Sequence, residues 1–226
     1  SLPASTFQAR PWLLVRWCTQ GLVAGQTSGA EERLQTAEQA LQNFRDLPNL
    51  RDLLGQIACA RATLALTRYD PETMIVQAQR ALEYLPAENL TFIFTAHWAL
   101  SRAYLFQGQR AAALQACQKS LTICEKSGGI FSTTLALATL GEIQFVDNQL
   151  PQAAETCQRL LPMFGEHPLP TAGDVCMLLA QIYYEWNDLA KAQVYGQKSL
   201  ELTHLYDKVI DRFILSEVFL ARLEFA

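Results

Sequence analysis

The sequence predicts an all-α protein: a right-handed superhelical solenoid of about five helical hairpins followed by a final helix. Three observations lead to this fold class. Pairs made of a small or apolar residue and a leucine recur with a nearly constant period along the chain. Each repeat holds two helical patterns joined by a tight turn, and the chain is 50% hydrophobic with only 18% charged residues. The period, about 40 residues, is typical of stacked helical repeats.

The repeat can be measured from the leucine that closes each pair. The steps between successive leucines differ from one another by no more than one or two positions. Ala113, Ala153 and Ala192 give a second register, whose two steps equal those between the last three leucines. Two registers with one period indicate tandem structural units. The five leucines are Leu41, Leu82, Leu121, Leu161 and Leu200.

The third unit gives the elements of one hairpin in order. Ser101 lies near the end of its first helix, Gly108 in the turn, and Ala113 in its second helix. Small residues at these offsets let two antiparallel helices approach closely. Gly108, and Asn148 and Asn187 in the next two units, suit the left-handed position that ends a helix.

Applied to the whole chain, this pattern predicts five hairpins and a final helix. Three prolines between residues 162 and 170 predict a loop before the fifth hairpin. Such repeats are stable only when stacked, so a single tetratricopeptide-like domain over residues 1–226 is expected. The predicted helices span residues 11–25, 31–45, 50–69, 71–85, 89–107, 110–127, 130–147, 150–164, 171–186, 189–204 and 208–225.

Composition and charge exclude several classes of protein. A net charge of −4 and a pI near 5.4 argue against a nucleic-acid-binding module. No apolar run reaches the roughly 18 residues of a membrane span, and the N-terminus lacks the pattern of a signal peptide. The six cysteines show neither Cys-x-x-Cys pairs nor zinc-ligand spacing. We therefore expect free thiols and a cytoplasmic location.

No local pattern indicates catalysis, a cofactor or a metal. His97, His167 and His204 lie too far apart in sequence for a local metal motif. Asp70 and Glu72 form a carboxylate pair at a turn before a helix, where helix capping explains them. We expect no enzymatic activity, no catalytic residue, no cofactor and no metal site.

Three segments carry a family resemblance. Residues 10–14 read Arg-Pro-Trp-Leu-Leu, residues 80–86 read Arg-Ala-Leu-Glu-Tyr-Leu-Pro, and residues 183–189 read Tyr-Tyr-Glu-Trp-Asn-Asp-Leu. Together they resemble the central tetratricopeptide region of the MalT-like, LuxR-family bacterial transcriptional regulators. The resemblance covers nearly the whole chain, and the third segment is its most specific part.

The resemblance implies a sensor domain taken from a longer regulator. In that family an NTPase precedes the sensor and a helix-turn-helix follows it. This chain contains neither a Gly-x-x-x-x-Gly-Lys-Ser/Thr phosphate loop nor a basic recognition helix. We therefore expect no ATP or DNA binding by these residues, and we expect the other domains of the parent regulator to be partners.

The register also gives a candidate ligand or partner groove. A stacked solenoid presents the first helix of each hairpin on its concave face. Aromatic rings beside charged and amide groups suit a sugar or a peptide, although the same rings could serve only to pack the repeats. The predicted groove residues are Trp98, Arg102, Phe106, Glu142, Phe145, Gln181, Tyr184 and Glu185.

Two binding functions follow, and the sequence leaves both open. The first is a sensor that recognises a small-molecule or peptide inducer in this groove. The second is a free-standing tetratricopeptide scaffold that docks a protein partner. Residues 209–225 form a strongly amphipathic pattern, so self-association into a homo-oligomer is also a hypothesis.

Overall fold

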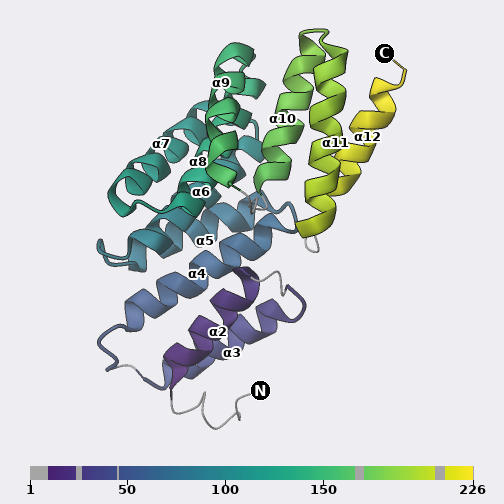
Figure 1. Ribbon diagram of the computed structural model, residues 1–226. Helices are drawn as coiled ribbons and strands as arrows, with labels where there is room; N and C mark the ends of the chain where they lie inside the picture. The colour runs from purple at the N-terminus through teal and green to yellow at the C-terminus, as the bar shows by residue number, and fades with distance from the viewer. Residues whose placement is uncertain (1–9, 24–26, 45, 166–170, 207–211, 226) are drawn as a thin grey trace. The chain divides into compact units, whose positions relative to one another are not determined.

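The computed structural model describes residues 10–23, 27–44, 46–165, 171–206 and 212–225. Those residues form eleven α-helices and one 3-10 helix and contain no strand, which confirms the all-α prediction (Figure 1). The predicted loop residues 166–170, including His167, and the predicted start of the last helix at 208–211 lie outside the described ranges. Contacts divide the chain into two compact units, residues 1–123 and 124–226, described separately below. A single domain and a right-handed superhelix stay predictions.

The first unit holds the first two hairpins and most of the third. Its helix α4 lies against both α2 and α6, so successive first helices contact one another. The helices are α2 (Pro11–Val23), α3 (Ala30–Gln42), α4 (Leu50–Leu66), α5 (Pro71–Tyr84), α6 (Leu90–Phe106) and α7 (Arg110–Ser127), which contains the boundary between the units.

The second unit holds two hairpins and the final helix. Its first helices α8 and α10 contact each other, and α12 packs on α11 (Figure 1). The elements are α8 (Ile130–Val146), α9 (Leu150–Leu160), the 3-10 helix η1 (Leu161–Phe164), α10 (Thr171–Glu185), α11 (Leu189–Tyr206) and α12 (Arg212–Leu223).

The predicted helices agree with these bounds to within a few residues, with one correction. The helix predicted over 150–164 is α-helical only to Leu160 and continues as the 3-10 helix η1. Pro162 lies at the start of η1. Because proline has no N–H and its ring clashes with the preceding turn, the α-helix cannot pass through it unchanged.

Four turns repeat one backbone geometry. Tyr69, Gly108, Asn148 and Asn187 all have positive φ, at 52°, 71°, 58° and 58°. They recur with the period of the repeat, and each follows the first helix of its hairpin. The residue after each donates its N–H to the carbonyl five residues earlier, as in Gln109 N to Tyr104 O at 2.8 Å. This is the Schellman arrangement, which caps the carbonyls at a helix C-terminus.

Small residues bring the paired helices together inside each hairpin. A Cβ added to Gly55 would lie 2.8 Å from a Leu85 side-chain atom, and one added to Gly173 would lie 2.8 Å from Thr203. Buried hydroxyls tie the same helices, since Ser101 Oγ donates to the Ala113 carbonyl at 2.9 Å. Glycine, alanine and serine at these offsets therefore serve close helix contact, as the sequence predicts.

Apolar clusters lie between the hairpins of each unit. In the first unit, one cluster joins α2, α3 and α4 through Val15, Leu34 and Ile57. The second unit has one continuous cluster in which Leu160 and Leu179 are fully buried. None of the described helices is both long and apolar enough to cross a bilayer.

Candidate functional site

The predicted groove residues of the first unit lie on one face of α6. Trp98, Arg102 and Phe106 are four residues apart, so they follow each other along the helix. All three are half-buried. The Arg102 guanidinium lies 5.3 Å from the centre of the Phe106 ring, and Tyr69 contacts the same ring at 5.6 Å. Phe106 therefore packs against Tyr69 and Arg102, in addition to its predicted place in the groove.

The predicted groove residues of α8 are also half-buried. Phe145 packs against the apolar cluster of the second unit. Glu142 lies near Cys157 of α9, and its charge is a secondary cause, after burial, of the raised pKa of that thiol, about 12. Phe145 is thus mainly a packing residue, while Glu142 brings a carboxylate to the same helix.

The predicted groove residues of α10 differ in their burial. Tyr184 is half-buried, contacts the Phe219 ring of α12 at 6.0 Å, and has the Arg222 guanidinium 4.9 Å from its ring centre. Glu185 is exposed and Gln181 is half-buried. Each helix thus presents polar groups next to rings, and a groove formed by all eight residues stays a prediction.

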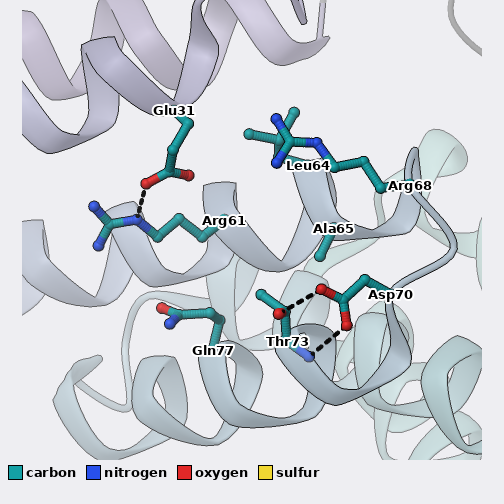
Figure 2. Close-up of a pocket in the computed structure, with 8 residues that line it drawn as sticks. All are labelled: Glu31, Arg61, Leu64, Ala65, Arg68, Asp70, Thr73 and Gln77. Carbon is teal, nitrogen blue, oxygen red and sulfur yellow. Dashed lines mark hydrogen bonds and ion pairs between the residues drawn. The ribbon is translucent and has the colours of Figure 1, made fainter.

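Sequence reasoning missed a second site, at the junction of α3, α4 and α5. Two hollows of about 250 and 310 Å³ open there. The first hollow is lined by Glu31, Arg61, Leu64, Ala65, Arg68, Asp70, Thr73 and Gln77 (Figure 2). The second hollow is lined by Glu38, Leu41, Gln42, Leu50, Leu54 and Arg80.

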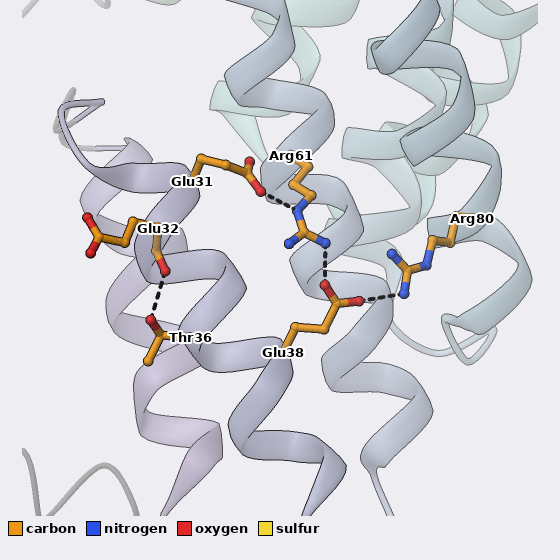
Figure 3. Close-up of polar contacts among 6 residues, drawn as sticks. All are labelled: Glu31, Glu32, Thr36, Glu38, Arg61 and Arg80. Carbon is orange, nitrogen blue, oxygen red and sulfur yellow. Dashed lines mark hydrogen bonds and ion pairs between the residues drawn. The ribbon is translucent and has the colours of Figure 1, made fainter.

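Four charged residues, which we call the charge cluster, connect the two hollows. Arg61 donates from Nε to Glu31 at 2.9 Å and from Nη1 to Glu38 at 2.5 Å, and Arg80 donates to the other oxygen of Glu38 at 2.6 Å (Figure 3). Only 13% of the Arg61 side chain is exposed. Burial acts to raise the pKa of the Glu38 carboxyl, but the bonds from Arg61 and Arg80 outweigh it and hold that pKa below its usual range.

One residue that lines the first hollow has a buried polar atom with no hydrogen-bond partner among the described residues. The Oε1 atom of Gln77 is buried and accepts no hydrogen bond. The Arg68 guanidinium lines the same hollow. Figure 2 shows Gln77 facing the space beside Arg61. A buried acceptor without a donor is uncommon in a folded protein, so this atom calls for a partner.

A sequence signal for this junction exists in the repeat itself. Late in the first helix of each hairpin stands a small residue, and the residue before it is Leu100 in the third hairpin, Leu140 in the fourth and Leu179 in the fifth. At the matching position, one repeat before Leu100, the second hairpin has Arg61. An arginine in place of a packing leucine indicates that carboxylates face it.

Other titratable groups are buried in ways that suit packing. All six cysteines are free and buried, and burial raises the pKa of the Cys176 thiol to about 11. Burial, together with Lys119, lowers the pKa of His97, so this imidazole is neutral near pH 7. The described residues include no group of three or more His, Cys, Asp or Glu side chains able to hold a metal ion.

A comparison with protein-family models matches most of the chain. The family model described as the MalT-like TPR region matches residues 55–226, which is most of the chain and includes α5 to α12. A search of curated proteins finds no significant match.

Proposed function

Because the chain belongs to the MalT-like TPR region family, we propose that it is the sensor solenoid of a larger, LuxR-type transcriptional regulator. It recognises a small-molecule or peptide inducer through the first helices of its hairpins. In this proposal the protein acts in the cytoplasm as a binding protein, not an enzyme. The other domains of the regulator, rather than this chain, contact nucleotide and DNA.

One observation supports this surface above all. Within each unit, successive first helices contact each other, and α6, α8 and α10 carry charged or amide groups beside half-buried rings. Arg102 lies over Phe106 on α6, and exposed Glu185 follows Tyr184 on α10. Apolar ring faces with a few orienting polar groups are typical of ligand sites.

Binding changes the activity of such a sensor by selecting among conformations. A ligand that prefers one arrangement of the hairpins shifts the population towards it by its difference in affinity for the two states. The short turns between paired helices make each hairpin rigid, so the change falls between hairpins rather than within them. The inducer then acts on the parent regulator without any chemical step in this chain.

A thermal-shift panel of sugars, nucleotides, amino acids and short peptides tests the proposal. A true ligand raises the melting temperature by mass action, since it binds the folded chain only. A ligand that binds through α6 is expected to lose its shift on Arg102→Gln, and one that binds through α10 is expected to lose it on Glu185→Gln. Glu155→Gln on the exposed face of α9 removes one carboxylate from a second helix, so it is expected to keep the shift.

A panel in which no compound raises the melting temperature contradicts the sensor proposal. A shift that all three variants retain contradicts the first-helix surface while leaving a ligand function in place.

The alternative function is a scaffold that docks another protein, and one surface favours it. Helix α12 exposes Ile214, Leu215 and Val218, with 43%, 61% and 62% of each residue accessible. Ser216 and Phe219 of the same helix are buried, so the three exposed residues mark the side of α12 that faces away from its packing contacts. If this face holds a protein partner, the partner that the unmodified chain retains in a pull-down is lost on Val218→Lys. The small-molecule panel is then expected to stay negative.

A further inference from the structure

We propose that Arg61 and Arg80 form a binding site for the carboxylate or phosphate group of a small metabolite. Glu38 occupies this site when no ligand is bound. The site lies at the junction of α3, α4 and α5 and is separate from the first-helix surface, so either site can fail its test without affecting the other.

The geometry is that of an anion clamp. Each oxygen of the Glu38 carboxylate is held by a different guanidinium, from Arg61 on α4 and from Arg80 on α5 (Figure 3). Arginine presents planar pairs of N–H groups that match carboxylate and phosphate oxygens equally well. Both side chains are largely shielded from water, with 13% and 32% exposed. Partial burial strengthens charged hydrogen bonds at such a site.

The space around the clamp fits a molecule larger than its anionic group. The second hollow, of about 310 Å³, has a floor of Leu41, Leu50 and Leu54 beside Arg80. In the first hollow, Asp70, Thr73 and Gln77 place further polar residues around the space beside Arg61. A metabolite with an anionic end thus finds room and a second polar contact next to the arginines.

Both arginines of the charge cluster keep other contacts when Glu38 moves away. Arg61 keeps its bond to Glu31 at 2.9 Å, so one carboxylate still faces it when a ligand replaces Glu38. Arg80 stays in place over the Tyr84 ring, 5.6 Å from the ring centre. Glu38 is therefore an internal competitor, and it lowers the apparent affinity for a ligand by the fraction of time that it occupies the clamp.

This competition predicts how the affinity for anions changes when the charge of Glu38 is removed. Glu38→Gln removes the competing charge and is expected to bind inorganic phosphate or acetate about tenfold more tightly than the unmodified protein. The measurement is isothermal titration calorimetry with sodium phosphate and with sodium acetate, each against sodium chloride at equal ionic strength. The anion that responds identifies the head group.

Glu32→Gln is the matched control. Glu32 lies on the same helix and loses the same charge, yet its side chain forms no bond with Arg61 or Arg80 in Figure 3. It is expected to bind both anions as the unmodified protein does. The double variant Glu38→Gln with Arg80→Gln is expected to lose the gain.

Three results overturn the proposal. One is Glu38→Gln binding both anions no more tightly than Glu32→Gln. Another is a gain that persists without Arg80. If Glu38→Gln does not fold, Glu38→Asp replaces it, because aspartate keeps the charge on a shorter side chain. The third result is then that Glu38→Asp binds the anions no more tightly than the unmodified protein.

Discussion

The second and fifth hairpins share a turn but meet their neighbours with different chemistry. Tyr69 and Asn187 take the same left-handed conformation, and Gly55 and Gly173 occupy the same place near the start of the first helix. Yet the position of fully buried Leu179 in the fifth hairpin is held by Arg61 in the second.

The difference separates two roles of the repeat sequence. Turns and small residues set the hairpin itself, and they are alike in both places. The residue before the small position faces the preceding hairpin and can change from apolar to charged if carboxylates change with it. Arg61 of the second hairpin is such a charged residue, and the carboxylates that face it are Glu31 and Glu38 of α3 in the first hairpin.

Exchanging the two chemistries has the largest expected effect. Leu179→Arg buries a guanidinium among apolar residues with no carboxylate from the charge cluster, and we expect a loss of about 3–5 kcal/mol in the free energy of unfolding. Urea denaturation measures it. Leu179→Met, which conserves volume, is the control, and a loss below that of this control contradicts the apolar assignment.

Close helix contact at the shared glycine gives the next effect. Gly173→Ala places a Cβ 2.8 Å from Thr203 Cγ2, and overpacking of this kind costs about 1–3 kcal/mol. Gly55→Ala meets the Leu85 side chain at the same distance. The two variants are expected to lose similar stability in urea. Stability equal to the unmodified protein in both refutes the idea of a common close approach.

Arg61→Leu gives the second hairpin the residue of the fifth, and its effect is expected to be smaller. Glu38 keeps its bond to Arg80, and nearly half of the Glu31 side chain is exposed, so its carboxylate remains hydrated. We expect a loss of about 1–2 kcal/mol in urea. A loss of unfolding free energy as large as that of Leu179→Arg would contradict the proposed difference between the two hairpins.

The shared turn predicts a smaller cost. Asn187→Ala puts a Cβ-bearing residue without a local polar side chain at φ of 58°, which costs about 1 kcal/mol. Asn187→Gly is the control. Its free energy of unfolding is expected to lie within a few tenths of a kcal/mol of that of the unmodified protein, since glycine adopts this conformation freely. Thermal denaturation of both variants checks the order, and equal losses would argue against the Schellman turn.

The acid dependence of the charge cluster is the mildest effect. The pKa of Glu38 is lowered in the folded protein, so its stabilisation is present above the ordinary glutamate pKa of about 4.3 and is lost as the pH falls through the folded value. The stability difference between the unmodified protein and Glu38→Gln is therefore expected to shrink between pH 7 and pH 3. A difference that stays constant over this range contradicts the bonding of an ionised Glu38.

The sequence predicted the hairpins but not the charge cluster, for a physical reason. Helix periodicity and the turn residues Gly108, Asn148 and Asn187 are local signals, and the structure confirms them. Tyr69 escaped notice because the rule for left-handed positions expects glycine or asparagine. The bonds of the charge cluster join residues 23 to 42 positions apart on three helices, so only packing brings them together.

The most direct test of the sensor proposal is hydrogen exchange of the backbone amides, read by mass spectrometry. The chain is compared with and without the panel compound that raises its melting temperature most. We expect slower exchange in peptides of α6, α8 or α10, because a ligand on the first helices suppresses their local opening. Slower exchange confined to the second helices α5, α9 and α11, or no change in any peptide, would contradict the account.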